Sequence, residues 1–127
     1  MTVDITTEID KEANLRTHKV TGGVTVDSLL AKLGEIYSRP DFQADMNSLW
    51  DLRGAEFLSM TSSELEKLAN FVVGHWGTGG KSRAALVVSR DFEFGLSRMY
   101  EIFVESRMSG EVEVFRDLDE ALAWVKS

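Results

Sequence analysis

An unbroken apolar run over residues 84–88 constrains the fold of this 127-residue chain more than any other feature of its sequence. A run of this length between polar residues is typical of a β-strand that is covered on both faces, which occurs mainly in parallel sheets. Ser89 and Arg90 end the run, and Asp91 is predicted to cap a helix that begins at Phe92. A helical stripe that should face the sheet follows: Phe92, Leu96, Met99, Tyr100 and Phe103.

Strands and helices alternate along the rest of the chain. Strands at 3–9 and 15–21 are predicted to form an antiparallel hairpin, and the second strand is predicted to end at Gly22-Gly23. A helix at 26–37 and a strand at 48–52 follow, and this strand is predicted to end in a turn at Arg53-Gly54. The last predicted elements are a helix at 63–76 behind a capping box at 61–64, a strand at 111–115 and a helix at 118–125 capped by Asp117. The strand at 15–21 alternates poorly, so its inward face stays open between Leu15 with Thr17 and His18 with Val20. This β-β-α-β-α-β-α-β-α order predicts a single α/β domain over 1–127, with a mixed, mainly parallel five-stranded sheet, an antiparallel N-terminal hairpin and four helices.

Charge and composition disfavour several kinds of partner and exclude several kinds of site. The chain has 14 basic and 21 acidic residues, so its net charge of -7 disfavours nucleic acid and anionic membranes. It has no cysteine, which excludes disulfides, thiolate metal sites and cysteine nucleophiles. No apolar run approaches the roughly 18 residues of a membrane helix, and the first residues lack the pattern of a signal peptide. We therefore expect a soluble cytoplasmic protein without membrane insertion.

Motifs for phosphate, metal or catalysis are incomplete. The loop 77–82 resembles a P-loop, but His75 stands where the motif needs glycine, and the loop leads from helix to strand instead of strand to helix. His18 and His75 lack cysteine or carboxylate neighbours at ligand spacing. G-x-S-x-G is absent, and no serine has an identifiable base. We therefore predict no metal, no cofactor and no catalytic residues.

Cationic and aromatic residues gather where the strands at 48–52 and 84–88 are predicted to end. Open α/β sheets usually hold ligands at this carboxyl edge, and guanidinium groups suit anions. The predicted ligand-binding residues are Arg53, Arg90, Asp91, Phe92, Phe94, Arg98 and Phe57, with Trp50 as a further candidate for the apolar wall. The alternative is that the arginines form surface ion pairs with neighbours such as Asp51 or Glu56, and that the aromatic residues belong to the core.

Hydroxyl groups crowd the start of the predicted helix at 63–76. Ser59, Thr61 and Ser62 are the candidate phosphoacceptors or partner-loop residues, because the free N–H groups and the positive dipole end of the helix would hold an added phosphate. The alternative is plain capping of the helix.

Three segments carry a resemblance to a known family: SLWDLRGAEF at 48–57, RAALVVSRDFEFGLSRMYEIF at 83–103 and VEVFRDLDEALAWV at 112–125. In this layout the chain resembles SpoIIAA-like domains of the STAS class, in the branch of small bacterial proteins without assigned function. The resemblance covers nearly the whole chain, and its most specific part lies at 115–124. It implies a SpoIIAA-like fold and no particular activity.

The resemblance also implies where a site would lie. In the anti-sigma-factor antagonists of this class, a phosphorylatable serine lies in an Asp-Ser-x-Gly motif between the central strand and the next helix. Here Ser59, Met60, Thr61 and Ser62 fall on that motif, so Met60 takes the phosphoacceptor position and Ser59 or Thr61 would have to substitute. The branch is also likened to the CRAL-TRIO lipid-transfer fold, which implies an apolar pocket under the helices.

Three functions follow as hypotheses. The leading one is a non-enzymatic domain that binds a small apolar or amphipathic, lipid-like anion at the carboxyl edge of the sheet. The alternative is a protein-interaction or partner-switching module that acts through residues 59–63. An enzyme with Asp51 or Asp91 as base rests only on the position of these carboxylates. The partners to expect are thus a small apolar or anionic ligand, another protein, or a second copy of the chain in a homodimer.

Overall fold

A computed structural model describes residues 2–58, 60–76, 82–107 and 110–127. Within these residues the chain forms five strands and four helices in the predicted order. They are β1 (Asp4–Asp10), β2 (Leu15–Val24), α1 (Val26–Tyr37), β3 (Asn47–Phe57), α2 (Ser62–Trp76), β4 (Arg83–Val87), α3 (Asp91–Glu105), β5 (Glu111–Phe115) and α4 (Leu118–Lys126). The predicted α/β class and element order are confirmed.

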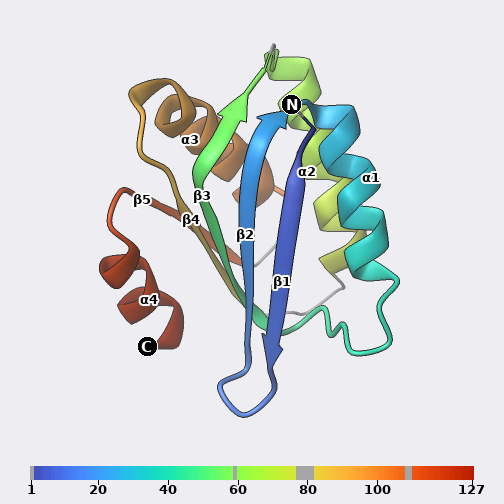
Figure 1. Ribbon diagram of the computed structural model, residues 1–127, viewed down its shortest axis with the longest axis vertical. Helices are drawn as coiled ribbons and strands as arrows, with labels where there is room; N and C mark the ends of the chain where they lie inside the picture. Colours follow the sequence, from blue (N-terminus) through green and yellow to red (C-terminus); the bar gives the residue numbers. More distant parts are fainter. Residues whose placement is uncertain (1, 59, 77–81, 108–109) are drawn as a thin grey trace.

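The strands form one mixed sheet in the order β1-β2-β3-β4-β5. β1 pairs with β2 antiparallel, and the pairs β2–β3, β3–β4 and β4–β5 are parallel, as predicted. Because each crossover leads to the next neighbour and crossovers are right-handed, α1, α2 and α3 all pack on the same face of the sheet. Figure 1 shows α1 and α2 on one side of the sheet and α4 on the other.

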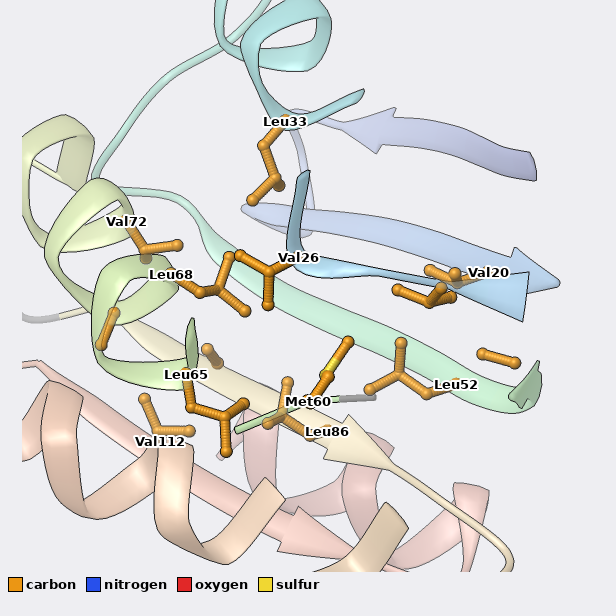
Figure 2. Close-up of a cluster of buried hydrophobic side chains, with 14 of the residues drawn as sticks. Val20, Val26, Leu33, Leu52, Met60, Leu65, Leu68, Val72, Leu86 and Val112 are labelled. Atoms are coloured by element: carbon orange, nitrogen blue, oxygen red, sulfur yellow. The ribbon is translucent and has the colours of Figure 1, made fainter. Parts of the chain in front are cut away.

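Two separate cores lie on the two faces of the sheet. The larger core joins the sheet to α1–α3, and Figure 2 shows side chains such as Val20 and Leu86 of the sheet opposite Leu65 and Leu68 of α2. The smaller core lies under α4: Leu15, Leu49, Ala85, Val87, Ala121 and Val125. Both faces of β2 therefore point into a core. This is why its sequence alternates poorly between apolar and polar residues.

Two strands are longer than predicted, because neither Gly22-Gly23 nor Arg53-Gly54 ends its strand. β2 continues through Gly22, which has φ +90 and whose position leaves no space for a side chain, since a Cβ atom there would lie 2.4 Å from the carbonyl oxygen of Thr2. β3 continues through Arg53-Gly54 to Phe57. Its register shifts between the pairs Lys19↔Asp51 and Thr21↔Gly54, so β3 carries one extra residue there, as in a β-bulge.

Helix α3 differs from its prediction in its start and in its buried face. It begins at Asp91, and its N-cap residue is Arg90, which makes no side-chain cap. The predicted stripe is wrong at Phe92 and Met99, which are 57% and 37% exposed. The fully buried positions are Glu93, Ser97, Glu101 and Val104. On this buried face, the Glu93 carboxylate accepts a hydrogen bond from the backbone N–H of Phe57, at 3.1 Å, at the end of β3.

The predicted caps of α2 and α4 are confirmed, whereas the predicted cap of α3 at Asp91 is wrong. The Thr61 hydroxyl accepts from the backbone N–H of Glu64, while the Glu64 carboxylate accepts from the backbone N–H of Thr61. Asp117 accepts from the backbone N–H groups of Asp119 and Glu120 at the start of α4. Such caps are local, since they satisfy donors within one turn of the helix, and they can be read from sequence.

Candidate ligand-binding site

An apolar cavity of about 90 Å³ lies between the sheet and the helices α1–α3. Its walls include Leu33 of α1, Leu65 and Val72 of α2, and Leu52 and Leu86 of the sheet, which Figure 2 draws around a common space. The lining follows the strands from their amino ends to their carboxyl ends. A cavity under the helices is the arrangement that the family resemblance implied, and it is longer than the predicted site at the carboxyl edge alone.

Arg16 of β2 lines the cavity near the amino ends of the parallel strands. It is 6% exposed, and its Nε and Nη1 atoms are buried without a hydrogen-bond partner among the described residues. Its guanidinium carbon lies 4.6 Å from the centre of the Phe42 ring, a cation–π contact. Burial lowers the pKa of Arg16, and neighbouring Tyr37 acts in the opposite direction. Because arginine stays charged in proteins, a cation lies in the wall of an apolar space.

Tyr37 of α1 and Tyr100 of α3 line the same cavity. Burial raises the pKa of Tyr37 to about 12, although the charge of Arg16 acts against the shift. Burial also raises the pKa of Tyr100, and Tyr37 adds to this effect. Within the described parts of the chain, neither hydroxyl has a hydrogen-bond partner. Both tyrosines therefore stay protonated at neutral pH, with O–H groups that can donate to a ligand.

His18 lies two residues beyond Arg16 on the same face of β2. It is completely buried, stacks on Trp50 with the ring centres 3.9 Å apart, and shares a hydrogen bond of 2.8 Å with the Thr7 hydroxyl through Nδ1. Burial lowers the pKa of His18 to about 3, and the charges of Arg16 and Arg39 reinforce the shift. The imidazole is therefore neutral, and it adds no second positive charge to this end of the sheet.

The structure gives no support for a metal site or a membrane span. Among the described residues, no group of three or more His, Cys, Asp and Glu side chains is arranged to hold a metal ion. His75 uses Nδ1 to donate to the carbonyl oxygen of Phe71, at 2.9 Å. No helix in the described ranges is both long enough and apolar enough to cross a membrane.

At the predicted carboxyl-edge site, Arg53 is already paired. Its Nε and Nη2 atoms donate to the two carboxylate oxygens of Asp51, each at 2.8 Å. The hydrogen bond from Arg53 is the main cause that lowers the pKa of Asp51. Asp51 shares its face of β3 with Leu49, which belongs to the core under α4. The pair therefore lies on the opposite face of the sheet from the cavity.

Arg90 and Phe57 meet around a third residue that the sequence did not indicate. The Glu93 carboxylate accepts from Arg90 Nη2 at 2.7 Å and from the backbone N–H of Phe57 at 3.1 Å. Glu93 is 2% exposed, so a carboxylate of the protein already occupies the position of a bound anion. A hollow of about 220 Å³ beside it opens to solvent and is lined by Glu56, Phe57, Arg90, Phe92 and Glu93.

The other predicted residues also lie in ion pairs along α3. Arg98 contacts Glu101 at 3.5 Å. Asp91 contacts Arg116 at 2.6 Å, and the Arg116 guanidinium lies 4.6 Å from the centre of the Phe94 ring. Of the predicted apolar wall, Phe57 and Trp50 line the cavity. The carboxyl-edge site stays a prediction, and an anion there would have to displace carboxylates.

The predicted phosphoacceptor loop is described only in part. Ser59 lies outside the described residues. Thr61 is exposed and uses its hydroxyl in the cap of α2, while Ser62 is the first residue of that helix. Met60, which takes the phosphoacceptor position of the family motif, is buried and lines the cavity (Figure 2).

Solved structures with similar folds come from two kinds of protein. An uncharacterized protein of the DUF3478 family with a SpoIIAA-like fold, from Shewanella loihica PV-4, is 20% identical and has a TM-score of 0.59; the match covers 98% of this chain and 94% of that chain. An anti-sigma factor antagonist from Mycobacterium paratuberculosis is 16% identical and has a TM-score of 0.64, with coverage of 99% and 96%. No family model and no curated protein matches the sequence.

The fold is therefore SpoIIAA-like, of the type found in STAS domains, and the prediction of this fold is confirmed. At these identities the likeness concerns the fold, and the chemistry of a site has to be argued from the residues of this chain.

Sequence reasoning missed Arg16, Phe42, Tyr37 and Tyr100 as site residues. One signal was present: Arg16 shares a strand face with His18 and Val20, and a charged residue on a face that is otherwise destined for the core is unusual. The signal could not be used while the inward face of this strand was ambiguous.

Proposed function

We propose that this protein is a non-enzymatic binding domain that takes a small amphipathic anion into the cavity between the sheet and α1–α3. The observation that carries the proposal is the buried guanidinium of Arg16, which has unpaired Nε and Nη1 atoms in the wall of an apolar space. Removing a charge from water costs several kcal/mol unless a partner compensates it. An anionic head group bound at Arg16 would supply the missing partner, while its apolar part would fill the cavity.

Two locations for the anion compete. At the carboxyl edge, Arg53, Arg90 and Arg98 already contact Asp51, Glu93 and Glu101. At the amino end, the Arg16 side chain has no carboxylate within ion-pair distance in the described ranges. Since a ligand at Arg16 displaces no protein carboxylate, we place the head group there and treat the carboxyl edge as the alternative.

The test is a binding measurement by native mass spectrometry and isothermal titration calorimetry, with hexanoate as the probe. Arg16→Met should abolish binding, because methionine keeps the apolar volume and removes the charge. The triple variant Arg53→Gln, Arg90→Gln, Arg98→Gln is the matched control and should bind as the wild type does. Loss of binding in the triple variant and retention in Arg16→Met would place the ligand at the carboxyl edge instead.

A second function, a protein-interaction module, is favoured by the fold likeness to an anti-sigma factor antagonist. The start of α2 at Thr61 and Ser62 is exposed. Thr61→Glu would add a negative charge there and should change the affinity for a protein partner, whereas Thr61→Ser keeps the helix cap and should not. Equal partner capture by wild type and Thr61→Glu would contradict this function.

A further inference from the structure

Few charged or titratable side chains line the cavity. Arg16 and His75 are the lining residues that can carry a positive charge, and no aspartate or glutamate lines the cavity among the described residues. His75 lies in an exposed position on α2, where its Nδ1 is bonded to Phe71. The nearby Arg39 donates a hydrogen bond to each of the two carboxylate oxygens of Asp41, both at 2.9 Å. One unpaired, buried positive charge thus faces the apolar space.

A single buried cation matches a single negative charge. A dianion such as a phosphate monoester would bring a second, uncompensated charge into a space with apolar walls, at a cost of several kcal/mol. A neutral ligand would leave Arg16 unpaired. A carboxylate neutralises the guanidinium and can accept several hydrogen bonds, for which it has two oxygens.

The hydroxyls of Tyr37 and Tyr100 are suited to the remaining lone pairs of a carboxylate. Arg16, Tyr37 and Tyr100 all line this cavity, and the charge of Arg16 acts on the pKa of Tyr37 while Tyr37 acts on the pKa of Tyr100. Their donors are N–H and O–H groups, all of which match an acceptor-only head group. The aromatic rings of Phe42 and Trp50 also line the cavity.

The volume of the cavity limits the apolar part of the ligand. The least volume that holds one water-sized group is roughly 10–15 Å³, so about 90 Å³ accommodates at most about six to nine non-hydrogen atoms. Short aliphatic and small aromatic acids are in this range, and long-chain fatty acids are well above it.

We propose that the ligand is a short monocarboxylate whose carboxylate is bound by the Arg16 guanidinium and the Tyr37 and Tyr100 hydroxyls, with its apolar part in the space under α2. This inference rests on the proposed function, since it names the class of ligand for the same cavity. Arg16 sets the required charge, the two tyrosines select a head group rich in acceptors, and the cavity volume sets the chain length.

The test compares four probes by isothermal titration calorimetry: hexanoate, 1-hexanol, hexyl phosphate and palmitate. Hexanoate should bind at least about tenfold more tightly than 1-hexanol, which is the discrimination expected from one hydrogen-bonded charge. It should also bind more tightly than hexyl phosphate, which brings a second charge, and than palmitate, whose chain exceeds the cavity volume. Tyr37→Phe should weaken hexanoate several-fold and leave 1-hexanol unchanged. Arg16→Met should remove the preference for hexanoate over 1-hexanol, and far-UV circular dichroism checks that each variant is folded.

The outcomes separate this inference from the proposed function. Equal or tighter binding of hexyl phosphate would overturn the carboxylate assignment and leave the proposed function, an amphipathic anion in the cavity, intact. Equal or tighter binding of 1-hexanol would overturn both, because the ligand would then need no negative charge. Tighter binding of palmitate would overturn the limit on chain length. If none of the four probes binds, the proposed function fails as well. If Tyr37→Phe binds hexanoate as the wild type does, the role assigned to that hydroxyl is wrong.

Discussion

The arginines at the two ends of the sheet differ in burial and in ion pairing. At the carboxyl end, Arg53, Arg90 and Arg98 are partly exposed, and each contacts a carboxylate of the protein. At the amino end, Arg16 is 6% exposed, and its buried nitrogens have no partner among the described residues. An arginine that is already paired is explained by the fold itself. One that is buried and unpaired has a cost that a ligand can offset.

The proposal of a site at the amino end therefore rests on the pairing of each charge and not on position along the strands. The carboxyl edge is where ligands usually bind in open α/β sheets, but in this chain acidic residues close to each arginine occupy that edge. The cavity instead includes Arg16, whose guanidinium lies over the ring of Phe42 and has no carboxylate within ion-pair distance among the described residues.

The largest expected effect comes from Glu93, the buried carboxylate of the carboxyl end. Glu93→Ala leaves the backbone N–H of Phe57 and the guanidinium of Arg90 without their partner, so we expect a loss of about 3 kcal/mol in the free energy of unfolding. Urea denaturation measures it. Glu56→Ala, at an exposed position of the same hollow, is the control and should change stability by less than about 0.5 kcal/mol. Similar losses in the free energy of unfolding for the two variants would mean that Glu93 does not stabilise the carboxyl end of the sheet.

The next effect is a pH dependence that belongs to the amino end. The pKa of His18 is lowered to about 3, so the unfolded chain takes up a proton below pH 6.5 that the folded chain does not. Stability should therefore decrease as the pH falls from 6.5, by about 2 kcal/mol at pH 5 from this residue. His18→Gln should flatten the profile, whereas Thr7→Val keeps the buried imidazole and should keep the slope. An unchanged slope in His18→Gln would assign the dependence to other groups.

Arg16 should behave differently from the paired arginines when it is replaced. Arg16→Met removes a buried charge that lacks a partner, so the ligand-free protein should gain about 1–2 kcal/mol in the free energy of unfolding. Thermal and urea unfolding measure the gain, and Arg16→Lys is the control that keeps the charge and should not gain. A destabilised Arg16→Met variant would show that the guanidinium contributes more through its packing on Phe42 than it costs by its burial.

The smallest effect is expected at Arg53. Its pair with Asp51 has good geometry but is partly open to solvent, so Arg53→Gln should cost less than about 1 kcal/mol. The pKa of Asp51 should rise toward its ordinary value, because the hydrogen bond from Arg53 is the main cause of its lowering. A carboxyl titration followed by NMR measures this shift. A change in hexanoate affinity in the same variant would break the contrast between the two ends of the sheet.

The sequence by itself determined the order of the elements, the parallel pairing and the caps of α2 and α4. These features depend on neighbours within a few residues: the apolar run at 84–88, the hydroxyl and carboxylate of Thr61 and Glu64, and the carboxylate of Asp117 before α4. Strand bounds were less predictable, since Gly22 and Gly54 act as turn signals in sequence but lie within strands whose neighbouring backbone or side chains pass close to them.

Only the tertiary structure decided which face of each element is buried and which charges are paired. Glu93 is buried on α3, where its carboxylate accepts a hydrogen bond from the backbone of Phe57, a residue far away in sequence. Arg16 became a site residue because α1, α3 and the segment before β3 bring Tyr37, Tyr100 and Phe42 over β2. The physical reason is common to both cases. Whether a buried charge stabilises or destabilises the protein depends on the partners that the fold brings next to it, and those partners come from elements that are distant in sequence.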